Sequence, residues 1–137
     1  IDGIDYHFLT KEEFENKIKE EFFIEYVLYN GNYYGTAKAC ISNDKVVILE
    51  PKGIKHYLEK VRDEVTVVFL RCSNEIVRIR MKQRGDSLDV IEKRLILDKE
   101  VFNKEIIQLC DFVVDTSASN VYQNAKDIYL LYKDYMK

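Results

Sequence analysis

Cysteine and histidine are scarce in this sequence, and their scarcity excludes several kinds of chemistry. The three cysteines, Cys40, Cys72 and Cys110, are odd in number and far apart, so they match neither a metal-ligand spacing nor a disulfide framework. We expect reduced, packed thiols, as in a cytoplasmic protein. The two histidines, His7 and His56, are isolated and belong to no Ser/His/Asp or Cys/His pattern. Nucleophilic catalysis therefore has no candidate residues here.

Long apolar runs and a strong net charge are also absent. No run is long enough to cross a bilayer and no stretch resembles a signal peptide, so we expect a cytoplasmic protein with no membrane partner. A net charge of -3 argues against a nucleic-acid partner, because such surfaces carry an excess of basic residues. With 47% hydrophobic and 33% charged residues, the 137-residue chain has the composition of one globular domain. The sequence gives no indication of an oligomeric state.

Patterns of strand and helix alternate along the chain. The first third predicts a small α+β lobe. It begins with a strand over 6–9 and a helix over 11–20, and the helix starts with a Thr10–Glu13 capping box. A hairpin follows, with a strand over 22–29, an Asn30-Gly31 turn and a returning strand at 33–34. The remainder predicts strands over 46–50, 65–71 and 112–114, with helices over 54–61, from Ser73 to Arg84, from Ser87 to Leu109 and over 121–132. The apolar strand 65–71 is expected to be buried on both faces. Alternating strands and helices predict an α/β fold with a parallel sheet.

Arginine is unevenly distributed. Five of the six arginines fall between positions 71 and 94, and Arg80 and Arg84 are four residues apart on one helix face. Gly85 ends that helix and Arg94 returns from the next, so three guanidinium groups could converge on one polyanion. The alternative is a solvated helix face with i,i+4 ion pairs, which spacing by itself favours.

A second candidate site combines acid and aromatic side chains. Glu25 lies in the first predicted strand of the hairpin, and Tyr34 and Thr36 follow the hairpin turn. A carboxylate in such a strand can accept from two adjacent N–H donors, but ordinary strand packing explains the same pattern.

Three blocks in this region resemble the GMP-binding lobe of the guanylate kinase family. They are residues 1–8 (IDGIDYHF), 23–26 (FIEY) and 31–36 (GNYYGT), and their spacing also matches. The segment with Arg80, Arg84-Gly85 and Arg94-Leu95 resembles the lid of that family, and 111–114 (DFVV) resembles the strand before its last helix. The resemblance covers nearly the whole chain in the right order, and 31–36 is its most specific block.

This resemblance implies a single domain over 1–137 with a P-loop nucleotide-kinase fold. It would comprise a GMP-binding lobe over 1–40 and a core over 41–137 with a helical lid around 80–95. It also implies transfer of phosphate from ATP, with Mg²⁺, to GMP. The implied roles are phosphate binding by Tyr6 and Tyr34, guanine binding by Glu25 and Thr36, and contact with the transferred phosphate by Arg80, Arg84 and Arg94.

The chain also departs from the family in places. It contains no G-x-x-x-x-G-K-[ST] loop, which in the family precedes the segment matching Ile1. Together with the non-Met start, this predicts an N-terminally incomplete chain that is inactive alone. Glu50 is the one acid where the family has an acid pair, and it is expected to serve the guanine or Mg²⁺. Two alternatives stay open, namely a non-catalytic domain of this type that binds a phosphopeptide, and a kinase for another nucleoside monophosphate.

Overall fold

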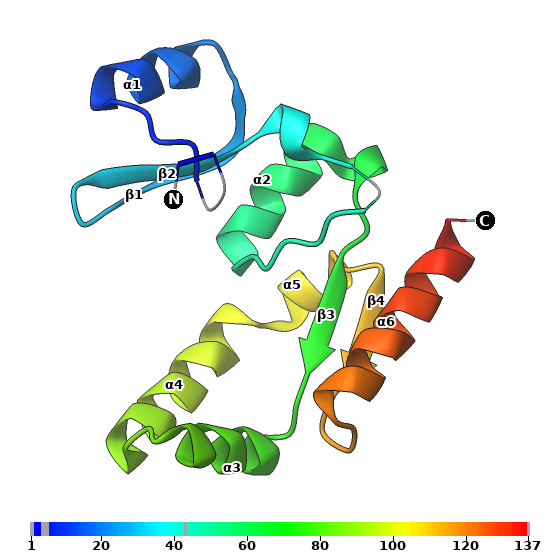
Figure 1. Cartoon of the computed structure of the whole chain (residues 1–137). Helices are drawn as coiled ribbons and strands as arrows, with labels where there is room; N and C mark the ends of the chain where they lie inside the picture. The colour runs from blue at the N-terminus through cyan, green and yellow to red at the C-terminus, as the bar shows by residue number, and fades with distance from the viewer. Residues whose placement is uncertain (1, 4–5, 43, 137) are drawn as a thin grey trace. The chain divides into compact units, whose positions relative to one another are not determined.

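A computed structural model of the chain describes residues 2–3, 6–42 and 44–136, and gives only the backbone of Tyr29. Contacts divide the chain into two compact units, Ile1–Val65 and Thr66–Lys137, which are described separately below (Figure 1). The expected single domain, with a GMP-binding lobe over 1–40 and a core over 41–137, stays a prediction. None of the helices in the described ranges has the length and apolar composition that crossing a membrane requires.

The first unit is built on a β-hairpin with one helix before it and one after it. Its elements are α1 (Lys11–Lys19), β1 (Phe23–Tyr29), β2 (Asn32–Ala37), η1 (Lys38–Cys40), α2 (Pro51–Val61) and η2 (Arg62–Glu64). The predicted capping box starts α1: the Glu13 amide donates to Thr10 Oγ1 at 3.2 Å, and the Thr10 amide donates to the Glu13 carboxylate at 2.7 Å. Asn30 and Gly31 both take positive φ, 49° and 79°, as the tight turn between twisted strands requires.

The hairpin and α2 together form a small core. A register shift between Phe23 and Glu25 leaves Ile24 outside the regular pairing, and Ile24 is completely buried against Tyr57 and Val61 of α2. Lys60 adds a polar tie, because its ammonium group donates to the carbonyl of Phe23 at 3.0 Å. The helix predicted over 54–61 as part of the larger core is α2, and it packs on the hairpin.

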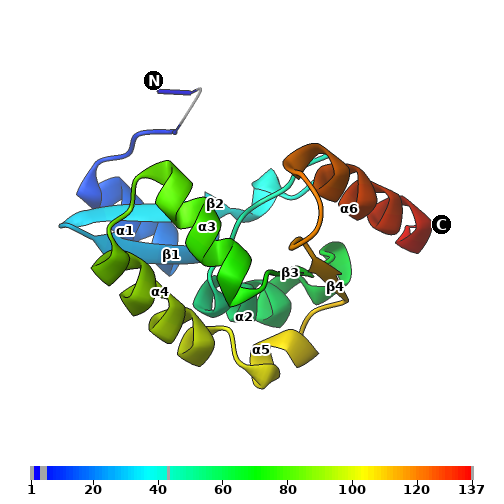
Figure 2. The same ribbon diagram turned by 90° about the horizontal axis from the view of Figure 1, so that it is seen from below.

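The second unit contains two parallel strands and four helices among its described residues. Its elements are β3 (Val68–Arg71), α3 (Asn74–Arg84), α4 (Leu88–Val101), α5 (Lys104–Gln108), β4 (Phe112–Asp115) and α6 (Val121–Tyr135). β3 and β4 pair in parallel from Val68 opposite Phe112 to Arg71 opposite Asp115, which confirms the predicted parallel pairing. α3 and α4 lie side by side, joined by a turn at Gly85 with φ 97° (Figures 1 and 2).

Two predicted strands are absent. Residues 6–9 form only an isolated bridge, between Asp2 and Tyr6, and residues 46–50 are irregular up to the start of α2. Val46 and Ile48 are 95% and 96% exposed. β-branched residues favour an extended backbone, but a strand also needs a neighbour to pair with, and none within the described residues pairs with 46–50.

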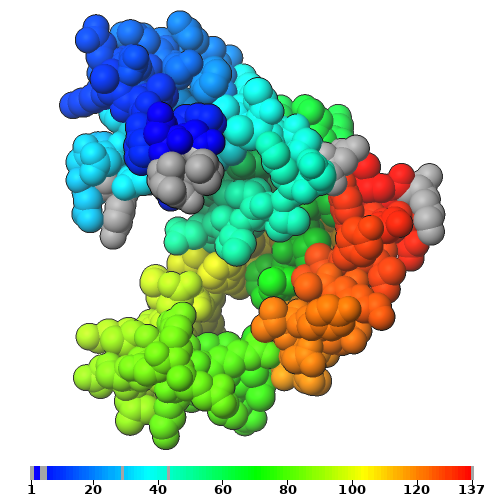
Figure 3. Space-filling view, in the orientation of Figure 1, coloured from blue at the N-terminus to red at the C-terminus, as the bar shows by residue number. Residues whose placement is uncertain are grey.

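The prediction that the strand at 65–71 is buried on both faces is also wrong for this structure. Leu70 is 55% exposed, and Val113 in the neighbouring strand is 45% exposed. An apolar run shows that a strand can be covered, whereas actual burial depends on which elements pack over it. The side chains of α6 are also exposed in places, with Val121 at 86% and Tyr122 at 79% (Figure 3, orange to red).

The long helix predicted from Ser87 to Leu109 is two helices. α4 ends at Val101, and Asn103 caps α5 by accepting from the Glu105 amide at 3.0 Å. Phe102 leaves the helical path, and its ring meets Phe69 of β3 edge to face at a centroid distance of 6.1 Å. A tertiary contact and an unrecognised cap therefore interrupt an apolar pattern that looked continuous. Ser87 has the backbone of an N-cap, but its side chain makes no capping hydrogen bond.

The three cysteines are free, as expected, although one of them is not packed. Cys72 and Cys110 are half-buried, whereas Cys40 is exposed in the short η1 helix.

Candidate functional site

The register of the β-hairpin decides which candidate side chains share a face. Glu25 lies opposite Thr36, and Tyr34 lies two residues before Thr36 on β2. Since alternate residues of a strand point to the same side, Glu25, Tyr34 and Thr36 share one face of the hairpin. The structure thus brings together three of the residues that the sequence singled out.

The opposite face of the hairpin packs on α1. The rings of Phe14 and Tyr33 stack with centroids 5.0 Å apart, and those of Phe14 and Phe23 stack at 4.2 Å. Gly35 lies between them, where an added Cβ would come within 3.0 Å of both phenylalanine rings and 3.1 Å of the Glu25 carbonyl oxygen. The absence of a side chain at position 35 therefore lets the aromatic stack close on this face of the hairpin.

Glu25 and Thr36 are joined directly. The Thr36 hydroxyl donates to Glu25 Oε1 at 2.9 Å, and both residues are half-buried. A carboxylate held by one neighbour keeps further acceptor positions on its two oxygens. The pair can therefore present two kinds of group to a ligand side by side. Glu25 provides hydrogen-bond acceptors, and Thr36 provides a hydroxyl group.

Tyr57 of α2 also lies near this pair, although no sequence motif marked it as a site residue. Its side chain is 5% exposed and packs with Ile24 in the core of this unit. Burial raises the pKa of the Tyr57 phenol, and the nearby Glu25 charge acts in the same direction, while the hydrogen bond with Thr36 opposes them. The available signal was a tyrosine on the apolar face of the predicted helix, since a buried hydroxyl group needs a partner.

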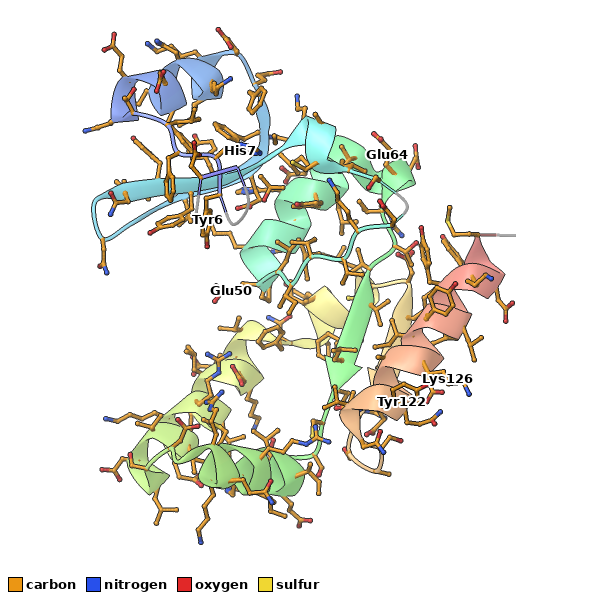
Figure 4. All side chains as sticks on the ribbon, viewed as in Figure 1. Tyr6, His7, Glu50, Glu64, Tyr122 and Lys126 are labelled. Atoms are coloured by element: carbon orange, nitrogen blue, oxygen red, sulfur yellow. The ribbon has the colours of Figure 1, made fainter. Side chains whose placement is uncertain are left out.

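Tyr6 approaches the same face of the hairpin from the N-terminal segment. Its ring meets that of Tyr34 edge to face with centroids 6.1 Å apart, although no strand forms around it. Both side chains are exposed, Tyr6 by 59% and Tyr34 by 41%, so their hydroxyl groups are accessible (Figure 4 labels Tyr6). The two phenols can serve as a pair of donors to an anion near the hairpin.

Glu50 is the N-cap residue of α2. Its backbone is extended, its side chain makes no capping hydrogen bond, and it is exposed (Figure 4). Among the described residues no group of three or more His, Cys, Asp or Glu side chains is placed to hold a metal ion. Glu50 can therefore offer a single carboxylate.

The three candidate arginines belong to the second unit, and each is engaged by a different protein partner. Arg80 reaches the segment between β4 and α6, donating to the Thr116 carbonyl at 2.6 Å and to that of Ser119 at 3.4 Å. Arg84 binds Asp86 in the turn after α3, with Nη2 2.6 Å from the carboxylate. The hydrogen bonds of these two arginines thus point to two different parts of the unit.

Arg94 makes an i,i+4 ion pair with Asp98 on α4, with Nε 2.9 Å from Oδ1. A fourth arginine, Arg78, ties α3 to α4 through two hydrogen bonds to Glu92, at 2.7 and 3.1 Å, and these bonds lower the pKa of Glu92. Such exposed pairs contribute little to stability. To converge on one phosphate, Arg80, Arg84 and Arg94 would have to exchange these protein partners for a ligand. Their convergence therefore stays a prediction.

The known proteins to which this chain is similar point to one family. A sequence profile described as guanylate kinase matches residues 1–128. A protein named guanylate kinase from Neisseria gonorrhoeae is 35% identical over 119 residues, which cover 82% of this chain and 57% of the relative. One from Enterococcus faecalis is 33% identical over 136 residues, covering 93% of this chain and 66% of the relative. The chain therefore spans roughly three fifths of the length of these relatives.

A solved structure supports the fold. The crystal structure of guanylate kinase from Anaplasma phagocytophilum matches with a TM-score of 0.59 and 19% identity, over 100% of this chain and 69% of that chain. At this level of identity the likeness concerns the fold, and it confirms the predicted α/β class.

Proposed function

The chain belongs to the guanylate kinase family, and from that premise we propose that the complete protein carrying it transfers the terminal phosphoryl group of ATP to GMP, giving ADP and GDP. The single observation that carries this proposal is the joined pair of Glu25 and Thr36, on the hairpin face that also holds Tyr34. The names of the relatives favour this enzyme over a non-catalytic phosphopeptide-binding domain.

Guanine recognition is assigned to Glu25 and Thr36. Guanine presents two adjacent donors, N1–H and the 2-amino group, beside one acceptor, O6. Glu25 would accept from the two donors while the Thr36 hydroxyl donates to O6. Adenine presents the reverse pattern, an acceptor at N1 and an amino donor at position 6, so it would leave Glu25 facing a lone pair.

Phosphate binding on the monophosphate side is assigned to the accessible phenols of Tyr6 and Tyr34, whose rings already touch. Their hydroxyl groups can donate to phosphate oxygens without bringing a charge. Arg80, Arg84 and Arg94 would act on the transferred phosphoryl group. Phosphoryl transfer depends mainly on positioning and on neutralising charge, and guanidinium groups supply both. The half-buried carboxylates of Asp86 and Asp98 would keep two of these arginines paired until phosphate oxygens replace them.

Mg²⁺ would accompany ATP. This ion keeps several waters and takes one or two carboxylates together with substrate phosphates, so it needs no protein cage. The lone exposed carboxylate of Glu50 fits that limited role, or a contact with the guanine. A cytoplasmic location, where ATP and GMP are both available, completes the proposal.

A coupled assay of ADP release with the complete protein, ATP, Mg²⁺ and each of GMP, AMP and CMP tests the proposed activity. We expect turnover with GMP in the usual kinase range of about 1–100 s⁻¹ and much slower turnover with the other two. No turnover with GMP, together with binding of a phosphopeptide to the same protein, would replace the enzyme with the binding domain. Faster turnover with AMP or CMP would show that the base was assigned wrongly.

A further inference from the structure

α3 and α4 form a helical hairpin that carries two of the arginines assigned to the transferred phosphoryl group (Figure 2). Arg84 is the last residue of α3, and Arg94 lies within α4. A small misplacement of a contact made in the transition state slows a reaction strongly. The joint action of these two arginines on one phosphoryl group therefore requires that the two helices keep a defined position relative to each other.

Apolar packing holds α3 only loosely on α4. None of the eleven residues that the structure describes in α3 is buried, whereas Ile91 of α4 is 1% exposed. A pocket of about 200 Å³ lies where the helices meet, and it is lined by Arg78, Ile79, Lys82, Leu88 and Ile91. An interface with such a gap constrains the two helices less than a filled interface does.

A bidentate ion pair between Arg78 and Glu92, here called the Arg78–Glu92 bridge, adds a further constraint. Nε of Arg78 on α3 lies 2.7 Å from Oε1 of Glu92 on α4, and Nη2 lies 3.1 Å from Oε2. Two parallel bonds between planar groups fix orientation as well as distance. The two side chains are 45% and 53% exposed, so the contribution of the bridge to overall stability is small. Its main effect is therefore on the relative position of the two helices.

Resting on the proposed function, we propose that Arg78 and Glu92 are positioning residues for phosphoryl transfer, which hold α3 against α4 so that Arg84 and Arg94 act on the same phosphoryl group. The Arg78–Glu92 bridge is separate from the ion pairs that Arg84 and Arg94 would exchange for phosphate, so it persists when the nucleotides bind. Loss of the bridge leaves both guanidinium groups present but lowers the fraction of time in which both are aligned.

The test measures the single-turnover rate of phosphoryl transfer from ATP to GMP in the complete protein, so that slow product release does not conceal the effect. Arg78→Gln and Glu92→Gln should each lower this rate roughly 2- to 5-fold, the range of one exposed ion pair. The dissociation constant for GMP, measured by titration calorimetry, should stay unchanged. The double variant should be no slower than either single variant, because both substitutions remove the same bridge. Since both side chains are about half exposed, all three variants should fold, which circular dichroism checks.

Lys82→Gln is the matched control, since it removes a positive charge one turn further along α3 and leaves the Arg78–Glu92 bridge intact. It should transfer phosphate at the unmutated rate. In an Arg94→Ala background, Glu92→Gln should cause no further loss, because α4 then carries no assigned guanidinium group to position. Unchanged rates in both single variants, an equal loss in Lys82→Gln, or an undiminished loss in the Arg94→Ala background would reduce the bridge to a surface ion pair and overturn the proposal.

Failure of the proposed function looks different, because the unmutated complete protein would then transfer no phosphate to GMP, and the positioning role would fall with it. An active unmutated protein whose Arg78→Gln and Glu92→Gln variants are equally active would refute the positioning role and leave the proposed function standing.

Discussion

Replacing Glu25 by glutamine tests the base-binding site most directly, because it changes a single oxygen to an amide nitrogen. The Glu25 side chain is half-buried and has one acceptor position used by Thr36 at 2.9 Å. Its remaining acceptor positions are the ones assigned to guanine. Glutamine keeps one carbonyl oxygen, but its amide group would confront a guanine N–H donor with another donor.

The magnitude follows from the kind of bond that is lost. A hydrogen bond to a charged group contributes about 1.5–3 kcal/mol, and the substitution removes one such bond and weakens its neighbour. At about 1.4 kcal/mol per factor of ten, GMP affinity should fall by roughly 10- to 150-fold. ATP affinity should stay within about twofold, since ATP is assigned no contact with Glu25.

Titration calorimetry with GMP and, separately, a non-hydrolysable ATP analogue measures both affinities in the complete protein. Glu15→Gln is a matched control, because Glu15 is also a half-buried acid that accepts from a hydroxyl group, but on the α1 side of the hairpin. We expect no change in GMP binding for that variant. Unchanged GMP binding by Glu25→Gln, with the protein folded, would make Glu25 an ordinary strand residue and refute the assignment of this face.

Three further perturbations address the arginines, the hairpin and the first helix. Arg84→Ala and Arg94→Ala should each lower kcat by roughly 10³-fold with little change in KM for GMP, by analogy with arginines that act on the transition state, and normal steady-state kcat values in both would return them to a solvated helix face. Gly35→Ala should lower the free energy of unfolding by about 1–3 kcal/mol in urea titrations, because its Cβ would meet rings at 3.0 Å and a backbone oxygen at 3.1 Å; a neutral effect would mean that the aromatic stack can move apart. Hydrogen bonds from the Thr10 amide and hydroxyl lower the pKa of Glu13, so the charged form stabilises the fold above the ordinary glutamate pKa, and this stabilisation is lost as pH falls through the lowered value. NMR titration should show Glu13 titrating below the ordinary glutamate value of about 4.3 and moving up towards it in Thr10→Ala, and identical curves would contradict the capping box.

The sequence by itself determined the elements that depend only on residues close together in the chain. The capping box at Thr10 places its hydrogen bonds within one helical turn, so it could be predicted without knowing what surrounds the helix. The Asn30-Gly31 turn is similar, because positive φ is required at both positions and few residues tolerate it. Glu25, Tyr34 and Thr36 could be grouped from sequence because a two-residue turn fixes the hairpin register, and with it the face that each side chain occupies.

Only the tertiary structure decided the features that depend on a distant partner. The apolar segment 46–50 has the composition of a strand but no strand beside it within the described residues, and the helix predicted through Leu109 is interrupted where Phe102 turns to meet Phe69. Tyr57 is the clearest case. Its sequence pattern marks it as one more residue on an apolar helix face, and only the packing of α2 on β1 buries its hydroxyl group near Thr36. Periodicity reports which side of an element is buried, whereas the partner of a buried polar atom depends on how elements far apart in the chain pack together.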